Sequence, residues 1–255
     1  MCLSIVTTVL NNEKYIRDCV DSVKRQKFKN KYEHIIVDGG SKDDTLKILK
    51  KLKKKNKNLK IFVKKNLGIY EAINYAIKKS KYNYIGLLHS DDFYKNDKVF
   101  KNILMQFKMN NKLLSIHSNV EFVKRDNKKK IVRFFKSEQL KSEDYFKCKH
   151  PPHTSLFVNK KIFDKFGLYN INLKIASDFE FMLRIYGINQ IYSKYINKTF
   201  IVMRAGGTST RSIFNIIISN YEVYKSFKIN NMKINIFYIL KKIFTKILQK
   251  IFKIY

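Results

Sequence analysis

Apolar and polar positions along the first half of the chain follow two rhythms, one typical of strands and one typical of helices. Four short runs are rich in β-branched and aliphatic side chains, as buried strands are: residues 3–9, 32–37, 60–63 and 84–88. Helical spacing fills the segments between them: the helix that Asn12 is expected to cap, residues 44–52 and residues 69–79. This order predicts a mostly parallel sheet with right-handed crossovers, whose ligands bind at the carboxyl ends of the strands.

The second half is patterned differently. Residues 115–124 and 131–135 predict a hairpin around the loop at residues 125–128. Further elements are expected after it: strands at residues 154–158, 191–195 and 199–203, and helices at residues 162–166 and 178–186. We therefore expect the parallel half to be followed by a half of mixed structure.

The last 44 residues have a composition of their own. Residues 212–255 hold eight Lys and a single acidic residue, Glu222, which gives a net charge of +7. From Leu240 to Phe252 the apolar residues keep a helical stripe, and the lysines lie mainly off it. The pattern predicts a basic amphipathic helix suited to an anionic membrane surface. Packing on the domain or on a second protomer is the alternative.

The whole chain has 255 residues and a formal charge of +33, because Lys and Arg number 53 and Asp and Glu number 20. An apolar share of 45% excludes a disordered basic tail. The charge alone suggests nucleic acid or an anionic membrane as partner. Only seven of the 53 basic residues are Arg, which readers of phosphates and bases favour, so nucleic acid ranks low and much of the charge is expected to be solvated background.

Cysteine use and the N-terminus predict a cytoplasmic protein. Cys2, Cys19 and Cys148 are scattered without metal-binding spacing, and Cys19 falls on an apolar helical face. The first strand follows Met1 without the pattern of a signal peptide, and no run approaches the roughly 20 apolar residues of a spanning helix.

An acidic tetrad, His-Ser-Asp-Asp at residues 89–92, follows the fourth apolar run. Two neighbouring carboxylates at a strand end offer hard oxygen ligands to Mg²⁺ or Mn²⁺, which proteins hold with few carboxylates together with substrate phosphates. Alternatively, Asp92 caps a following helix. The tetrad by itself favours neither interpretation.

Two more polar segments stand at the ends of predicted elements. Asp38 can accept hydrogen bonds from a base or ribose, and the Gly pair after it lets the backbone approach a ligand; an ordinary turn capped by Asp43 or Asp44 is the alternative. Asp178 opens a predicted helix, where it is either a general base facing a cleft or a cap, a role that Ser177 can also take.

These segments belong to a series of six that spans residues 3–210: Ser-Ile-Val-Thr at residues 4–7 followed by Asn11, Asn12, Tyr15 and Ile16; Val-Asp-Gly-Gly-Ser at residues 37–41 with Asp43 and Thr45; Gly-Ile-Tyr-Glu-Ala-Ile-Asn at residues 68–74; Ile-Gly-Leu-Leu-His-Ser-Asp-Asp at residues 85–92; Pro-His-Thr at residues 152–154; and Ile-Ala-Ser-Asp-Phe-Glu at residues 175–180. Together they resemble the motifs of glycosyltransferase family 2, inverting enzymes of the GT-A fold. The third is similar to a block of a bacterial branch that builds surface polysaccharides and lipid-linked oligosaccharides.

The resemblance implies an α/β, Rossmann-like GT-A domain with a mostly parallel sheet over residues 1–210. Residues 1–115 would form its nucleotide-sugar-binding half and residues 116–210 its acceptor-binding subdomain. Residues 211–255 would be the basic tail of C-terminal amphipathic helices.

The resemblance also implies a UDP-linked sugar as donor, with Mn²⁺ or Mg²⁺ as cofactor. The residues implied to bind the donor are Thr7, Asp38, Gly39, Asn74, Ser90, Asp91 and His153, although a buried structural role is the alternative for the last. Asp91 and Asp92 would hold the metal on the pyrophosphate, where it neutralises charge on the departing UDP. Asp178 would take the proton of the acceptor hydroxyl, and one in-line displacement would turn an α-linked donor into a β-linked product.

The chain departs from the family pattern at His89, Asn66 and Ser177, where relatives often carry acidic residues or Asn. Processive relatives such as cellulose and hyaluronan synthases carry a Trp motif and spanning helices. Because this chain has no Trp, we expect it to add a single sugar. The main alternative function is a nucleotidyltransferase, which the lack of Gly after the first strand disfavours.

A lipid-linked saccharide acceptor would give the tail a role. Its basic amphipathic helix would hold the protein peripherally on the inner face of the cytoplasmic membrane. The oligomeric state stays open, and a homo-oligomer is compatible with the sequence.

Overall fold

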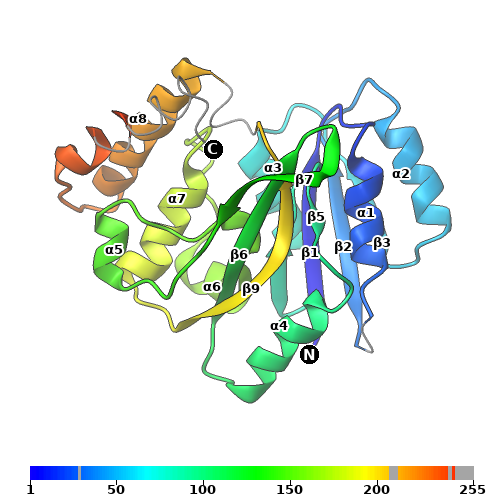
Figure 1. Ribbon diagram of the computed structural model, residues 1–255, viewed down its shortest axis with the longest axis horizontal. Helices are drawn as coiled ribbons and strands as arrows, with labels where there is room; N and C mark the ends of the chain where they lie inside the picture. The colour runs from blue at the N-terminus through cyan, green and yellow to red at the C-terminus, as the bar shows by residue number, and fades with distance from the viewer. Residues whose placement is uncertain (28–29, 207–211, 241–242, 245–255) are drawn as a thin grey trace.

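The computed structural model of the chain describes residues 1–27, 30–206, 212–240 and 243–244 (Figure 1). Strands and helices alternate through its first half: β1 Leu3–Val9, α1 Ile16–Lys24, β2 Tyr32–Asp38, α2 Thr45–Lys54, β3 Leu59–Val63, α3 Ile69–Lys79, β4 Tyr84–Leu87, β5 Phe93–Tyr94 and α4 Val99–Met109. The alternation predicted from the apolar pattern is confirmed, and α3 has the predicted bounds.

The second half is mixed, as predicted. Its elements are β6 Ser115–Lys124, β7 Asn127–Phe135, α5 Ser142–Phe146, a 3₁₀ turn at His153–Ser155, β8 Phe157–Asn159, α6 Lys161–Phe166, α7 Ser177–Met182, a π-helical turn at Leu183–Ile188, β9 Ser193–Arg204 and α8 Ile213–Ile229. The expected hairpin is the antiparallel pair β6–β7.

A single sheet joins both halves in the order β3-β2-β1-β4-β8-β6-β9-β5. β7 is not part of this order but pairs with β6. The pairs β2–β3, β1–β2 and β1–β4 are parallel. β8 runs antiparallel to both β4 and β6, and β9 runs parallel to β6. The expected parallel sheet therefore holds for the first half, whereas the second half mixes both directions.

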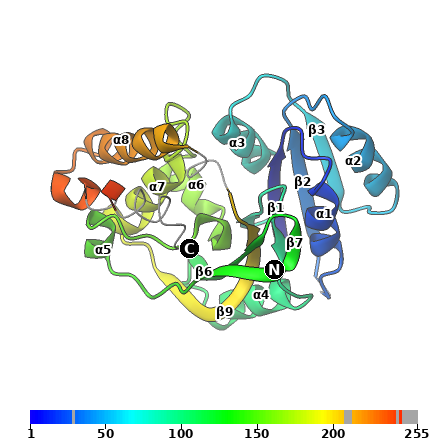
Figure 2. The same ribbon diagram turned by 45° about the horizontal axis from the view of Figure 1, so that its top comes forward.

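Alternating side chains of the strands face two separate cores. On one face, Leu3, Ile5 and Val9 of β1 pack in the core that α1 and α4 cover. On the other face, Val6 lies in the core that α3, α6 and α7 cover. Figure 2 shows α5, α6, α7 and α8 gathered at one end of the sheet and α1 and α2 at the other. Cys19 is fully buried, as expected for a small core residue.

The start of the predicted tail packs on the domain. Helix α8 lies against α7, and its residues Val223 and Phe227 belong to the core on the α3 face, together with Ile239. The helical stripe expected from Leu240 to Phe252 lies largely outside the described residues. None of the helices in the described ranges is long and apolar enough to cross a membrane.

Several local predictions were wrong. Asn12 does not cap α1 with its side chain, because α1 begins only at Ile16, after Tyr15; Asn12 Nδ2 instead donates to Ser90 Oγ at 2.8 Å. The strand expected from residue 154 begins at Phe157, after a 3₁₀ turn in which Ser155 Oγ donates to the carbonyl of Pro152. The two strands expected between residues 191 and 203 are one strand, β9, with irregular register against β6 near Asn119.

Candidate functional site

The polar segments singled out by the sequence lie at one edge of the sheet, because the strands that precede them run in the same direction. β1, β2 and β4 are parallel, so Asp38 and the turn at residues 89–92 lie at the same carboxyl edge. Two successive antiparallel pairings make β6 parallel to β4, and β9 is parallel to β6. Arg125 after β6 and Arg204 at the end of β9 therefore reach this edge as well. Parallel strand ends are where such sheets bind their ligands.

The two neighbouring carboxylates at this edge differ in burial. The Asp91 side chain is 23% exposed, and its Oδ2 lies 3.1 Å from Arg125 Nη1. The Asp92 side chain is 1% exposed, and its Oδ1 accepts a hydrogen bond from the Arg204 backbone N–H at 3.1 Å. Burial, together with the neighbouring Asp91 charge, raises the pKa of Asp92 well above its usual value. Asp92 precedes β5 and does not cap a helix, because α4 begins at Val99.

A cluster of cations surrounds this acidic pair. Arg204 is 4% exposed, donates through Nη1 to the carbonyl oxygen of Asp91, and places Nη2 2.5 Å from Asp18 Oδ2. The guanidinium carbons of Arg125 and Arg204 lie 5.0 and 4.5 Å from the centre of the Tyr15 ring. Two cations thus lie over the ring of Tyr15 beside Asp91; each is paired with a carboxylate, and Arg125 is the more exposed of the two.

The oxygen atoms at the acidic pair fit a divalent cation that a phosphate ligand helps to hold. Among the described residues, no three or more His, Cys, Asp or Glu side chains are grouped closely enough to form a metal site. Asp91 offers a partly exposed carboxylate, and Asp92 Oδ2 is buried without a hydrogen-bond partner in the described part of the chain. Few protein carboxylates completed by substrate phosphates are the usual ligands of Mg²⁺.

Asp178 reaches the site from the second half of the chain, in the first turn of α7. The side chain is partly exposed, and its Oδ1 accepts a bond from the neighbouring Phe179 N–H at 2.8 Å. α7 begins after Ala176 without a side-chain cap, and Ser177 Oγ is buried without a partner among the described residues. The two cap interpretations are therefore wrong. A partly exposed carboxylate next to the acidic edge is suited to accept a proton.

Two histidines link Asp178 to the acidic pair. His89 Nδ1 lies 3.6 Å from Asp92 Oδ2. Burial lowers the pKa of His89, against the opposing effect of the Asp91 and Asp178 charges. Burial lowers the pKa of His153 to about 4, again opposed by Asp178. Both rings are therefore neutral at pH 7, and both lie within electrostatic range of Asp178.

His153 and Asn74 act on the same residue, Tyr169. His153 Nε2 lies 2.9 Å from Tyr169 Oη. Asn74 donates to the Tyr169 carbonyl at 2.8 Å and accepts from its N–H at 3.0 Å. Both polar groups of the Asn74 side chain are engaged by this backbone, so Asn74 positions Tyr169, and its expected contact with the donor stays a prediction. His153 is buried, which matches the structural alternative, although its ring borders the site.

Thr7 does not present its side chain to the edge. It is 1% exposed, and its Oγ1 donates to the Leu88 carbonyl at 2.7 Å and lies 2.9 Å from His34 Nε2. It shares the pleat face of Leu3 and Ile5, which α1 and α4 cover. The Thr7 side chain therefore ties β1 to the end of β4, and the expected role of Thr7 in donor binding stays a prediction.

The carboxylate of Asp38 holds its own turn. It is fully buried; Oδ1 accepts the N–H groups of Gly40 and Ser41 at 2.9 Å each, and Oδ2 accepts Ser41 Oγ–H at 2.6 Å. Of the Gly pair, Gly40 has the conformation that requires glycine, with φ +95°. Asp38 thus holds the turn that carries Gly39 at the edge, and its expected contact with a base or ribose stays a prediction.

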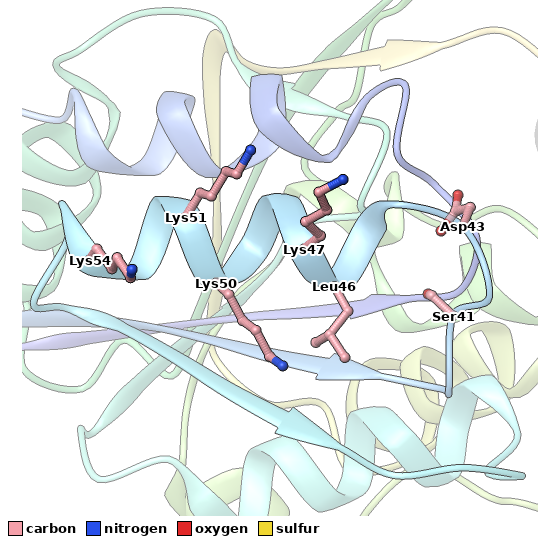
Figure 3. Close-up of a pocket in the computed structure, with 7 residues that line it drawn as sticks. All are labelled: Ser41, Asp43, Leu46, Lys47, Lys50, Lys51 and Lys54. Atoms are coloured by element: carbon pink, nitrogen blue, oxygen red, sulfur yellow. The ribbon is translucent and has the colours of Figure 1, made fainter.

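A surface depression runs along α2 from Ser41, which is hydrogen-bonded to Asp38. Four lysines line it, at positions 47, 50, 51 and 54, together with Ser41, Asp43 and Leu46. Figure 3 shows Lys47 and Lys51 extending to one side of the helix and Lys50 to the other. Divergent lysines on an exposed helix match the solvated background charge expected from the composition.

Four site residues received no role from the sequence: Tyr70, Arg125, Tyr169 and Arg204. Arg125 and Arg204 stand out only through the scarcity of Arg in a Lys-rich chain. Placing them requires the direction of β6 and β9 relative to β4, which local patterns do not encode.

Comparisons with known proteins agree with this geometry. The model of glycosyl transferase family 2 matches residues 4–167. An uncharacterized glycosyltransferase of Rickettsia typhi is 30% identical over 197 residues, which cover 74% of this chain and 60% of that protein. Chondroitin synthase of Pasteurella multocida is 39% identical over 97 residues, or 38% of this chain and 10% of the synthase. The chain thus spans about 60% of the length of the Rickettsia typhi relative and a smaller part of the synthase.

Solved structures show the same fold. A crystal structure of S. aureus TarS superposes with a TM-score of 0.69 at 19% identity, covering 100% of this chain and 72% of that one. TarS has also been solved in complex with UDP and with UDP-GlcNAc. The mannosyltransferase PcManGT from Pyrobaculum calidifontis, in complex with GDP-Man and Mn²⁺, gives a TM-score of 0.63 at 12% identity, covering 88% of this chain and 64% of that one.

Proposed function

Because the chain belongs to glycosyltransferase family 2, we propose that it moves one sugar from a UDP-linked donor to a hydroxyl group of a saccharide acceptor, with inversion to a β-glycoside. The observation that carries this proposal is that the charges of Asp91 and Asp178, from separate halves of the chain, both act on His89 at one edge of the sheet. The TarS complexes with UDP and UDP-GlcNAc support the choice of donor.

The donor diphosphate is proposed to lie beside Asp91, next to the exposed side chain of Arg125. Asp91, with Asp92 behind it, would hold Mn²⁺ or Mg²⁺ against the diphosphate; bound there, the metal supplies Lewis-acid stabilisation of the departing UDP. Arg125, whose Nη1 lies 3.1 Å from Asp91 Oδ2, adds positive charge at the same place, and the buried Arg204 holds the Asp91 backbone through its carbonyl. Ser90 and His153 border this position, and the turn of Asp38 and Gly39 would receive the nucleoside.

Asp178 is proposed to be the catalytic base. Its carboxylate would accept the proton of the acceptor hydroxyl while the hydroxyl oxygen attacks the anomeric carbon and the bond to the UDP oxygen breaks. The electron pair of that bond leaves with UDP, so no covalent intermediate on the protein is required. Asp178 lies within electrostatic range of both His89 and His153, which burial keeps neutral.

The acceptor is proposed to be a lipid-linked saccharide, in the biosynthesis of a surface polysaccharide or another glycan. Support comes from exposed apolar side chains on α8 and on the segment after it, among them Phe214 at 69%, Tyr221 at 64% and Phe237 at 62%. In a chain of net charge +33, such residues suit an anionic membrane surface. The protein would then act peripherally on the inner face of the cytoplasmic membrane.

A panel of nucleotide sugars with Mn²⁺ tests this function. UDP release would be measured with and without lipid-pyrophosphate saccharide acceptors, using wild-type protein and the Asp178→Asn variant. We expect acceptor-dependent UDP release by the wild type with one donor of the panel. No release with any donor, or equal release by the variant, would contradict the proposal.

A further inference from the structure

Glu222 of α8 binds the segment that leads into α7. Its Oε1 accepts the N–H of Lys174, and its Oε2 accepts the N–H groups of Ile175 and Ala176, all at 2.8 Å. The side chain lies 46 to 48 residues from these partners along the chain and is 6% exposed. A single carboxylate thus fixes three consecutive peptide groups.

The charge of Glu222 is balanced by backbone dipoles. Within the described ranges, no Lys, Arg or His forms an ion pair with it, although the chain carries 53 Lys and Arg. Hydrogen bonds from N–H groups to a carboxylate are among the stronger ones in proteins, and a buried carboxylate without them is costly. Glu222 is also the single acidic residue among residues 212–255. The backbone N–H groups of residues 174–176 are therefore the partners that hold the Glu222 carboxylate.

Asp178 follows two residues after the segment bound by Glu222. Tyr70 holds this segment from the other side, since its Oη donates to the Ile175 carbonyl at 2.7 Å and lies 3.5 Å from the Asp178 N–H. Burial, with the nearby Asp178 charge, raises the pKa of Tyr70, so the hydroxyl keeps its proton and stays a donor. Ile175 is thereby fixed through its N–H by α8 and through its C=O by α3.

We propose that Glu222 is a positioning residue for Asp178, so that α8 sets the place of the catalytic base. The inference rests on the proposed function and deepens it: α8, the start of the predicted tail, acts on the chemistry through this one side chain. Without the carboxylate, residues 174–176 lose three anchors, and the carboxylate of Asp178 shifts relative to the acceptor hydroxyl. Because displacement of a reacting group by about 1 Å can cost about 100-fold in rate, the effect falls on kcat.

The variants Glu222→Gln and Glu222→Ala test the proposal. An amide keeps one acceptor oxygen, while its NH₂ group would face an N–H donor, so Glu222→Gln keeps part of the anchor and Glu222→Ala keeps none. We expect UDP affinity, measured by calorimetry, and the KM for the donor to stay within about twofold, because the diphosphate site lies on other elements. The kcat for transfer should fall about tenfold or more, in the order wild type, Gln, Ala. Lys225→Ala, an exposed position on the same helix, is the matched control and should keep the wild-type kcat.

Hydrogen exchange of the amides of residues 174–176 gives a second readout that is independent of the reaction. These amides should exchange about tenfold or more faster in Glu222→Gln, and faster still in Glu222→Ala, while those of α3 keep their rates. Unchanged exchange, a wild-type kcat in spite of faster exchange, or a loss of kcat matched by an equal loss of UDP-binding stoichiometry would overturn the proposal. If the wild type transfers no sugar while the exchange changes as expected, the proposed function fails and the anchor itself stands.

Discussion

Substituting Gly86 by Ala should destabilise the centre of the sheet. Gly86 lies on β4 between Ile5 of β1 and Phe157 of β8. A Cβ atom at this position would lie 2.5 and 2.7 Å from two ring carbons of Phe157 and 3.2 Å from Ile5 Cδ1. Ordinary contacts between carbon atoms begin near 3.5 Å. The Phe157 ring would thus have to retreat by about 1 Å.

The ring has no free space to retreat into. Phe157 is fully buried and stacks at 6.3 Å on the ring of Tyr94, which is fully buried too. Overpacking of this kind costs about 1–3 kcal/mol, and a rigid ring on a central strand favours the upper half of that range. For a chain of this length, a loss of about 2 kcal/mol lowers Tm by about 4–8 °C.

Urea unfolding of the wild type, Gly86→Ala, Phe157→Leu and the double variant measures this effect. If the clash with the ring is its cause, the double variant is more stable than the sum of the two single changes predicts, by about 1 kcal/mol or more. A Gly86→Ala protein with the wild-type midpoint would refute the reasoning. If the effects of the two substitutions on the free energy of unfolding simply add, the destabilisation by Gly86→Ala does not come from the contact with Phe157.

Three further outcomes are expected. Gly40→Ala, at φ +95°, should lower the free energy of unfolding by about 1 kcal/mol or more, whereas Gly39→Ala, whose Cβ would meet only ordinary contacts from 3.5 Å, should have little effect in the same urea titration. Burial lowers the pKa of His34 to about 3 and of His153 to about 4. As the pH falls, the unfolded chain therefore takes up these two protons before the folded protein does. The free energy of unfolding is at its full value above pH 6.5 and decreases below it, by about 2 kcal/mol per histidine at pH 5. Replacing His153 by Asn should therefore reduce the loss between pH 7 and pH 5 by about that amount, and an unchanged loss would contradict the argument. EDTA should abolish transfer and Mn²⁺ should restore it in the wild type but not in Asp91→Asn; transfer in EDTA would reject the role of the acidic pair.

The sequence predicted the parallel half well because its signals are local. Helix α3 was predicted to its last residue, since Ala72, Ile73, Ala76 and Ile77 repeat at helical spacing and are all buried. Strand β9 was divided into two because its irregular pairing to β6 has no counterpart in the local pattern.

The site was predicted where a motif and its neighbours along the chain suffice. Asp91 and Asp178 both act electrostatically on His89, and the burial of the Thr7 side chain follows from the strand pleat, which places it on the same face as Leu3 and Ile5. Arg204 and Glu222 could not be predicted, because the first depends on strand direction and the second on a hydrogen-bonded contact 46 residues distant.

The central claim is that Asp178 takes the acceptor proton in a transfer that inverts the donor's anomeric carbon. It is tested most directly by incubating the active donor and acceptor with wild-type protein and with Asp178→Asn, following product by ¹H NMR of the anomeric proton. The account predicts a β-linked product from an α-linked donor with the wild type, and UDP binding without product for the variant. An α-linked product, or transfer by Asp178→Asn near the wild-type rate, would contradict it.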